Sequence, residues 1–367
     1  MKLLCDHQRL REGLALVNGI IPNKATRQAL ENVNLVAKDG TLELVGTDLE
    51  VALRLSIEDV KVGEPGTVLV PGRVTADFVR DLVGDTVSLE TSGENKLIVS
   101  SGSGRGELPT SDPDEFPVVA RFEEKGALSV QGGTFQKLVA RTAFASAKEQ
   151  GRYAMHGILV MVEDETLRMV ATDGRRLAVS SAPIVGDGGP PRRAIVPTKA
   201  MQAFQRVITD PLEQVQLQFT DSQLGLRTKR AEVFARLIDG EFPRYTAVVP
   251  TETSHLLEAD AEQLARHLKL VSNVTTTDAR AVRLSLSTGR LELFGRSAAA
   301  GQASAQMDAD FKGDDCDIAF NPDFLMEGLR NCESDVVRLE FNDRTSPGKF
   351  TLGENYVYVV MPITVDI

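Results

Sequence analysis

Apolar and polar residues alternate with a period of two along short stretches of this chain, and three of these stretches are nearly the same. Leu42 to Val45 reads LELV, Leu167 to Val170 reads LRMV, and Leu291 to Phe294 reads LELF. Apolar residues at the first and third positions with a charge between them are typical of a strand with one buried face. The stretches lie about 125 residues apart, so the pattern predicts the same strand three times.

A helical pattern recurs at the same interval. In each copy a proline precedes apolar residues spaced three or four apart, as in PGRVTADFVRDLV from Pro71. Proline suits the first helical position, where its missing N–H would have no partner. These helices are predicted over residues 71–83, 197–209 and 320–331. A further amphipathic helix is predicted near the start of each copy, over residues 6–18, 133–144 and 260–272.

The repeats predict an α+β fold with three homologous domains in tandem, each with two helices packed on antiparallel sheets. Phe-Pro at Phe116 and Phe242 closes the first two copies, and Met361-Pro362 falls near the matching place in the third. The domains are expected over residues 1–122, 123–250 and 251–367. Hairpin turns are predicted at residues 91–95, 220–223 and 342–349.

Composition indicates a globular protein of the cytosol. Apolar residues make up 42% and charged residues 25% of the 367. No apolar run approaches the roughly 20 residues that span a bilayer, so no membrane partner is expected. The three cysteines are odd in number and form no CxxC, which argues against a structural zinc site and against a disulfide framework.

Charge is distributed unevenly between the predicted helices and the rest of the chain. The net charge is −11, yet the six predicted helices contain 11 basic and 8 acidic residues. Arg73 and Lys199 fall in a first helical turn, where the helix dipole disfavours cations. One interpretation is a shared helical face that meets a polyanion, and the other is a set of exposed, solvated side chains.

The sequence offers little support for an enzyme. GSGRG at Gly102 to Gly106 lacks the spacing of a dinucleotide fingerprint and the lysine of a phosphate-binding loop, so a hairpin or edge segment is expected there. Clustered carboxylates at residues 112–116 and 308–317 could suggest a metal, but the second stretch lacks the glycine and terminal glutamate of an EF-hand loop, so solvated loops are expected. The four histidines form no arrangement with a nucleophile. Neither turnover, nor a cofactor, nor a metal is expected.

Three motifs together resemble one known family. TDGRRLA at Thr172 to Ala178, FPRY from Phe242 and YVVMP at Tyr358 to Pro362, within three tandem domains, are similar to the bacterial DNA polymerase III beta subunit, the sliding clamp. The resemblance implies a head-to-tail homodimer that forms a ring, encircles duplex DNA without reading its sequence, and acts as the processivity factor of the replicative polymerase. It also implies a bacterial cytoplasmic location, on the nucleoid during replication.

The family also implies partners and site residues. The partners are the DNA polymerase III alpha subunit, clamp-loader subunits, and other polymerases and repair proteins with clamp-binding peptides. The peptide groove is expected to contain Met155, Thr172, Gly174, Arg175, Arg176, Leu177, Pro243, Val248, Met361 and Pro362. The DNA-facing residues are expected to be Lys24, Arg73, Arg80, Lys199 and Arg206. The dimer contact is expected at Leu108, Leu270 and Val271.

The chain departs from the family pattern at four places. Gly106 stands where an aromatic residue is common, Arg175 where histidine is common, and Ala247 where a basic residue is common; the chain ends in ITVDI at residues 363–367. A clamp paralogue that serves as a binding scaffold or as an inhibitor decoy, without a replication duty, is the alternative function.

Overall fold

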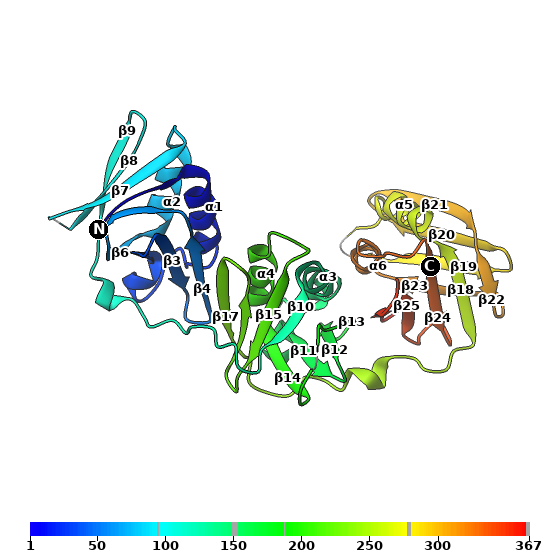
Figure 1. The fold of residues 1–367 in the computed structure, drawn as a ribbon. Coiled ribbons are helices and arrows are strands. Elements are labelled where there is room, and N and C mark those ends of the chain that lie inside the picture. The colour runs from blue at the N-terminus through cyan, green and yellow to red at the C-terminus, as the bar shows by residue number, and fades with distance from the viewer. Residues whose placement is uncertain (94, 149–152, 187, 277–279, 365–367) are drawn as a thin grey trace. The chain divides into compact units, whose positions relative to one another are not determined.

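The computed structural model describes residues 1–93, 95–148, 153–186, 188–276 and 280–364 (Figure 1). The chain forms two compact units, each of which combines segments that are distant in sequence. Unit 1 comprises Met1–Gln136, Ile184–Gly189 and Lys199–Leu237. Unit 2 comprises Lys137–Pro183, Pro190–Thr198 and Ile238–Ile367.

All six predicted helices are present. They are α1 (His7–Asn18), α2 (Gly72–Asp81), α3 (Gly132–Thr142), α4 (Thr198–Val207), α5 (Ala261–Ser272) and α6 (Pro322–Leu329). Asp6 begins α1 by accepting a hydrogen bond from the Arg9 amide at 2.8 Å, and Asp260 begins α5 in the same way with Gln263 at 2.7 Å. A side-chain oxygen in this position satisfies an amide that the helix itself leaves unpaired.

The prediction that proline opens the second helix of each copy is right for Pro322 and wrong for the other two. Pro71 and Pro197 are the last residues of strands, paired with Asn32 and Gly157, and each helix begins one residue later. A strand end tolerates proline because one side of the residue needs no ladder hydrogen bond.

Unit 1 contains two antiparallel sheets. The first has the order β5-β1-β7-β8-β9, with β5 (Lys61–Glu64), β1 (Lys2–Asp6), β7 (Thr86–Ser92), β8 (Lys96–Ser101) and β9 (Gly104–Pro109). The second has the order β10-β15-β16-β17-β4-β3-β2-β6, with β10 (Leu128–Gln131), β15 (Gln214–Phe219), β16 (Gln223–Arg227), β17 (Ala231–Arg236), β4 (Val51–Ile57), β3 (Thr41–Thr47), β2 (Asn32–Lys38) and β6 (Gly66–Pro71). Helices α1 and α2 pack against each other (Figure 1).

Unit 2 also contains two antiparallel sheets. The larger has the order β14-β11-β12-β13-β26-β25-β24-β18-β22, with β14 (Arg192–Pro197), β11 (Gly157–Glu163), β12 (Thr166–Thr172), β13 (Arg176–Pro183), β26 (Tyr356–Val360), β25 (Gly348–Thr351), β24 (Val336–Phe341), β18 (His255–Asp260) and β22 (Asp310–Lys312). The smaller has the order β21-β20-β19-β23, with β21 (Gly301–Asp308), β20 (Arg290–Ser297), β19 (Val282–Ser287) and β23 (Cys316–Phe320).

The strand and turn predictions can be checked against these bounds. The three repeated strands lie in β3, β12 and β20, and hairpin turns join β15 to β16 and β24 to β25 as predicted. The turn predicted at residues 91–95 includes residue 94, which lies outside the described residues. GSGRG forms the turn into β9, an edge strand, as expected.

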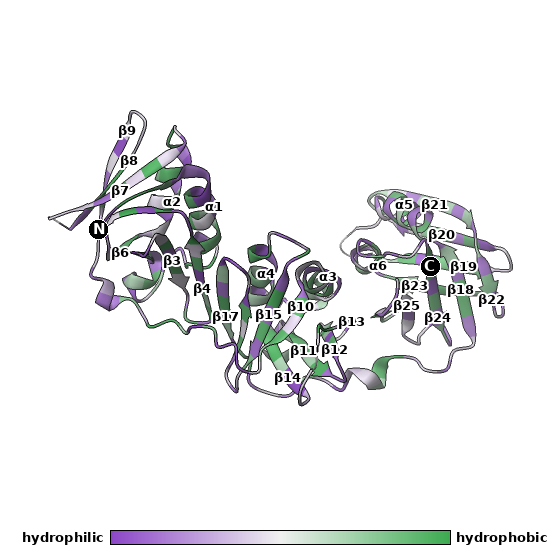
Figure 2. Ribbon diagram, viewed as in Figure 1, coloured by the Kyte–Doolittle hydropathy of each residue, from purple (hydrophilic) through white to green (hydrophobic). Residues whose placement is uncertain are grey.

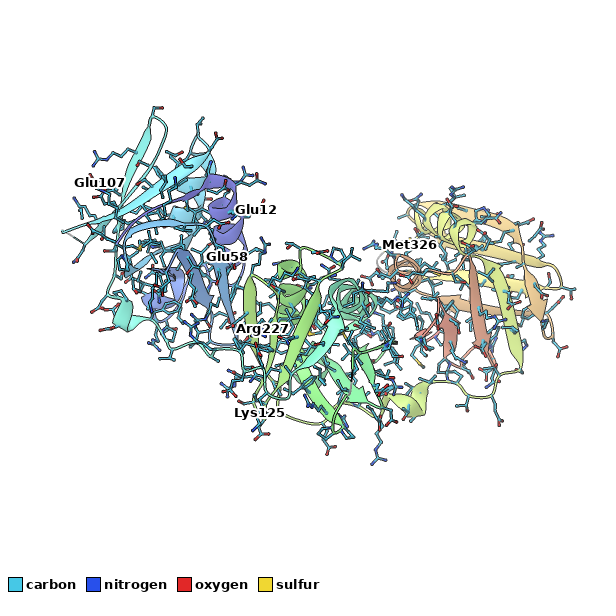
Figure 3. All side chains as sticks on the ribbon, viewed as in Figure 1. Glu12, Glu58, Glu107, Lys125, Arg227 and Met326 are labelled. Carbon is cyan, nitrogen blue, oxygen red and sulfur yellow. The ribbon has the colours of Figure 1, made fainter. Side chains whose placement is uncertain are left out.

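Each large sheet continues across a boundary that was predicted between domains. Strand β4 pairs with β17, with Leu55 opposite Ala231, and β13 pairs with β26, with Arg176 opposite Val360. At the first boundary, Arg227 (Figure 3) forms an ion pair with Glu124 at 2.8 Å and lies 4.8 Å above the Phe122 ring. The boundaries after residues 122 and 250 stay predictions.

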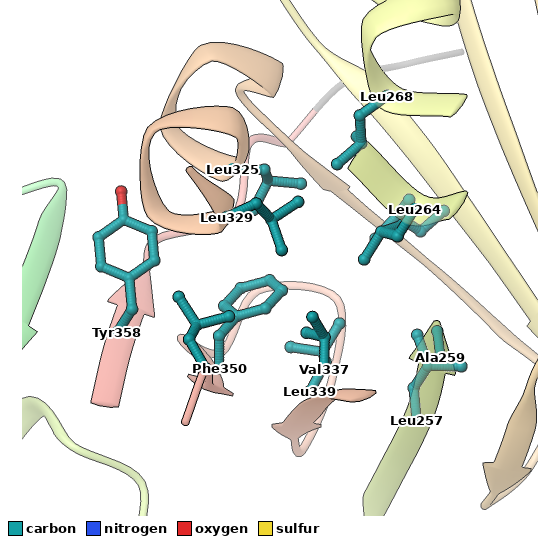
Figure 4. A pocket seen from close by; sticks show the side chains of 12 residues that line it. Leu257, Ala259, Leu264, Leu268, Leu325, Leu329, Val337, Leu339, Phe350 and Tyr358 are labelled. Carbon is teal, nitrogen blue, oxygen red and sulfur yellow. The ribbon is translucent and has the colours of Figure 1, made fainter. Parts of the chain in front are cut away.

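Hydrophobic and hydrophilic residues alternate along many of the strands, as a half-buried sheet requires (Figure 2). In β4 every second residue from Val51 to Ile57 is buried. In unit 2, Leu264 and Leu268 of α5 and Leu325 of α6 face Leu339 and other strand residues around a small apolar pocket (Figure 4). This packing places α5 and α6 over the large sheet, from which the groove described below is built.

Candidate functional site

An open apolar groove lies in unit 2 beside the junction of β13 and β26. Four short segments form it: the 3-10 helix Tyr153–His156, the turn between β12 and β13 with the strand residues beside it, the 3-10 helix Tyr245–Val248 with the two residues before it, and the end of β26. The lining residues are Met155, Thr172, Gly174, Arg175, Arg176, Leu177, Pro243, Arg244, Tyr245, Val248, Val359 and Met361. Its free volume is about 130 Å³.

The Thr-Asp-Gly turn is fixed by its own side chains. The Thr172 hydroxyl donates to the Arg176 carbonyl at 2.6 Å and accepts from the Gly174 amide at 3.1 Å. The Asp173 carboxylate accepts from the amides of Arg175 and Arg176 at 2.9 and 3.1 Å. Gly174 has a φ of +88°, a conformation that glycine adopts without strain. The turn therefore presents a stable backbone along the groove.

The floor of the groove is buried and its rim is exposed. Leu177 and Val359 are each 2% exposed and belong to an apolar cluster that includes Phe242. Val248 and Met361 are 48% and 41% exposed, which is high for apolar side chains. Exposed apolar rims around a buried floor are typical of a binding surface.

Arg176 is buried although it carries a charge. Its guanidinium forms ion pairs with Asp173 at 3.0 Å and with Glu327 of α6, and it donates to the Phe144 carbonyl at 2.7 Å. It also lies 4.3 Å above the Phe324 ring. Arg176 therefore ties the turn to α6, and its charge is compensated within the chain rather than offered to a ligand.

The surroundings of Arg176 favour its charged form. Burial lowers the pKa of Arg176, but the neighbouring Tyr358 and Glu327 outweigh burial, so the pKa is raised above its ordinary value. Burial also raises the pKa of the Tyr358 phenol, whose hydroxyl donates to the Phe324 carbonyl at 3.0 Å. The guanidinium is thus held in its charged form beside the carboxylates of Asp173 and Glu327.

The structure brings together most of the residues predicted for the groove. Pro362 follows the lining residue Met361 but does not itself line the groove. Arg244, Tyr245 and Val359 were missed. Arg244 and Tyr245 belong to the FPRY motif and Val359 belongs to YVVMP. The two motifs therefore contain the residues that the sequence prediction omitted. The last three residues of the ITVDI tail lie outside the described residues.

The five basic positions predicted to face DNA all belong to unit 1 and are exposed. Two of them lie on α2 beside acidic residues: Arg80 pairs with Asp77 at 2.7 Å and with Asp81 at 3.0 Å, and Arg73 lies 3.9 Å from Asp77. The hydrogen bonds that Arg80 donates to Asp81 and to Asp77 raise the pKa of Arg80. Carboxylates therefore offset much of the positive charge on α2.

The other three basic positions differ from one another. Lys199 at the start of α4 forms an ion pair with Asp48, which compensates for its unfavourable place in the first turn. Lys24 and Arg206 form no ion pair within the described residues. The Arg206 guanidinium comes close to Gly19 at the end of α1, where the helix dipole favours a cation.

The three residues predicted for the dimer contact differ in their exposure in the single chain. Val271 is 0% exposed, because its side chain packs against Gly295 of the same unit, and Leu108 on β9 is 6% exposed. In the single chain these two side chains therefore offer little or no surface, and the dimer contact stays a prediction. Leu270 is 53% exposed and remains a candidate. At Gly106, the Phe78 ring of α2 covers the space that a side chain would need.

The described residues contain no group of three His, Cys, Asp or Glu side chains that is close enough to hold a metal ion.

Of the three free cysteines, Cys5 is buried, and burial raises the pKa of its thiol to about 12. Cys316 and Cys332 are half-buried. Within the described residues, no helix is long and apolar enough to cross a membrane.

Comparison with known families matches nearly the whole chain to the domains of one family. The N-terminal domain of the DNA polymerase III beta subunit matches residues 1–120, its central domain matches residues 129–244, and its C-terminal domain matches residues 246–364. The Beta sliding clamp of Pseudomonas putida is 30% identical over 367 residues, and that of Escherichia coli is 30% identical over 366 residues. Each alignment covers 99% of this chain and 100% of the relative.

Solved structures agree in fold. The DNA polymerase III subunit beta from Pseudomonas aeruginosa superposes with a TM-score of 0.91 at 29% identity and covers 100% of both chains. The DNA polymerase sliding clamp from Bacillus subtilis gives a TM-score of 0.95 at 23% identity and covers 100% of this chain and 99% of its own. At 23% identity, the likeness to the Bacillus subtilis structure concerns the fold alone.

Proposed function

This chain belongs to the beta sliding clamp family of DNA polymerase III beta subunits, and we propose that it is the processivity factor of a replicative DNA polymerase. It tethers other proteins to DNA and catalyses no reaction of its own. We place it in the bacterial cytoplasm, on the nucleoid during replication.

The groove in unit 2 is the observation that supports this function most directly. Its free volume of about 130 Å³ is close to that of an apolar cavity of about 150 Å³ that holds benzene. One aliphatic or aromatic side chain of a peptide therefore fits, and Met361 at the rim can adapt to different partners. The proposed ligands are peptides of the polymerase alpha subunit, clamp-loader subunits, other polymerases and repair proteins.

Two copies are proposed to join head to tail into a ring around duplex DNA. A closed ring holds DNA by topology, so weak phosphate contacts suffice, and strong ones would slow sliding. This suits a chain with a net charge of −11 in which Arg73, Arg80 and Lys199 are partly neutralised by carboxylates. Lys24 and Arg206 are therefore proposed to contribute most to the attraction of DNA phosphates.

The scaffold or inhibitor-decoy alternative is not favoured. The relatives that match 99% of this chain carry the name Beta sliding clamp. Among the described residues, both an open groove and exposed cations are present, as a clamp requires. A decoy would need only one of these two surfaces.

Replacing Met361 and Val248 together by alanine is expected to weaken binding of a partner peptide at least about tenfold, because each truncation removes apolar contact area worth about 1 kcal/mol. Stimulation of primer extension by the cognate polymerase should fall accordingly, while the dimer persists. Both residues are exposed, so the fold should tolerate the change. Val336→Ala on β24, with a similarly exposed valine outside the groove, is the matched control. Undiminished stimulation by the double variant would remove the groove from the proposal.

A further inference from the structure

Two aspartates of unit 1 hold three of the five basic side chains that are proposed to face DNA. Asp77 on α2 gives one carboxylate oxygen to each of two arginines: Oδ1 lies 2.7 Å from Arg80 Nη1, and Oδ2 lies 3.9 Å from Arg73 Nε. Asp48, in the turn between β3 and β4, pairs with Lys199 of α4. At each of these cations a carboxylate of the same chain therefore occupies a place that a DNA phosphate would take.

Asp48 divides its two carboxylate oxygens between two tasks. Oδ1 accepts hydrogen bonds from the amides of Glu50 and Val51 at 3.0 and 2.7 Å, which fixes the turn. Oδ2 accepts from the ammonium of Lys199. The side chain of Asp48 is 11% exposed and that of Lys199 is 53% exposed. Because the turn already orders the carboxylate, only the lysine loses side-chain freedom when the two groups pair.

The repeated turn in unit 2 uses the same carboxylate differently. Asp173 also accepts hydrogen bonds from two amides of its turn, but its second oxygen pairs with Arg176 of that turn. In unit 1 the place of Arg176 is taken by Val51, whose carbonyl accepts from the turn threonine in the same way. The second oxygen of Asp48 is therefore open to a cation from a distant segment, and Lys199 is that cation.

We propose that Asp48 and Asp77 compete with DNA phosphates for the three cations that they hold, and that this competition limits the affinity of the protein for duplex DNA. The inference rests on the proposed clamp function and adds the groups that keep its DNA contacts weak. Each exposed ion pair is weak by itself, but a carboxylate of the same chain is present at a high effective concentration. A ring that holds DNA by topology does not need the phosphate contacts that are lost in this way.

The test measures binding of the full-length protein to a short, labelled linear duplex by fluorescence anisotropy over a series of salt concentrations. Asp48→Asn keeps the oxygen that accepts from the turn amides and replaces the other oxygen by an amide group that cannot hold a lysine. This variant is expected to bind the duplex about three- to tenfold more tightly at low salt. The slope of log K against log salt should become steeper by about 0.9, which corresponds to one further phosphate contact.

Further variants assign the effect to the ion pairs. In a Lys199→Gln background, Asp48→Asn should leave the slope unchanged, because the cation that it would release is absent. Asp77→Asn releases the two arginines of α2 without touching the turn, and it should also steepen the slope. Asp310→Asn is the matched control: Asp310 lies 3.8 Å from Lys312 on β22, both side chains are exposed, and neither is a proposed DNA contact. It removes the same charge and should bind DNA as the unaltered protein does.

The outcomes separate this proposal from the clamp function. Unchanged slopes for both Asp48→Asn and Asp77→Asn would overturn the competition, and so would an equal change in Asp310→Asn, since net charge alone would then be responsible. An effect of Asp48→Asn that persists without Lys199 would overturn the role of that pair. In each case the unaltered protein should still stay on nicked circular plasmid in high salt after loading by a clamp loader. Its loss from intact circles would contradict the clamp function itself.

Discussion

Arg176→Ala is expected to lower the free energy of unfolding of unit 2 by about 3 to 5 kcal/mol, the range found when one partner of a buried ion pair is removed. Its guanidinium is buried, and the substitution leaves Asp173 and Glu327 without their cation. The link between the turn and α6 is lost as well, so the groove should bind partner peptides poorly. Urea denaturation followed by circular dichroism measures the first effect, and peptide anisotropy measures the second.

A matched substitution separates this effect from the loss of an arginine in general. Arg266 on α5 pairs with Glu262, and both side chains are about three-quarters exposed. Arg266→Ala should therefore change the free energy of unfolding by about 0.5 kcal/mol or less. If the two variants unfold at the same urea concentration, Arg176 does not have the structural role assigned to it here.

Leu270→Lys is expected to convert the dimer into monomers. Leu270 on α5 is 53% exposed in the single chain, so the fold of the chain does not depend on this side chain. At an apolar contact between chains, however, an unpaired ammonium loses its water, which costs several kcal/mol. Sedimentation velocity at micromolar protein concentration should show a single species with the mass of one chain and with unchanged thermal unfolding.

Leu212→Lys provides the control for this substitution, because Leu212 is 77% exposed outside the proposed contact. That variant should remain dimeric. Val271 is unsuitable for the test, since a lysine at this fully buried position would disrupt the core of unit 2 and produce monomers for another reason. A Leu270→Lys protein that still sediments as a dimer would exclude Leu270 from the interface.

The repeated patterns predicted the helices and many of the strands, because apolar periodicity reports which face of an element is buried. They could not predict that β4 pairs with β17 or that β13 pairs with β26. Pairing between strands more than a hundred residues apart leaves no local signature, since it depends on register and on which edges remain open. Two domain-sized repeats therefore share one sheet in each unit.

The candidate site was predictable in part. The motifs identified the turn at Gly174 and the rim residue Met361. The motif FPRY also contains Arg244 and Tyr245, but their place in the groove depends on the 3-10 helix that begins at Tyr245. Burial separated Val271 from its neighbour Leu270, although the two are adjacent in the sequence. Ion pairs such as that of Lys199 with Asp48 bring together residues 151 positions apart, so the count of basic residues on the helices overstated their free charge.

Retention on DNA tests the proposed clamp most directly. The protein is loaded onto nicked circular plasmid with a clamp loader and washed in high salt, and the plasmid is then cut once. A ring that holds DNA by topology predicts that the protein stays on intact circles in high salt and is released after linearisation. Release from intact circles by salt alone would mean ordinary electrostatic binding and would contradict the proposed function.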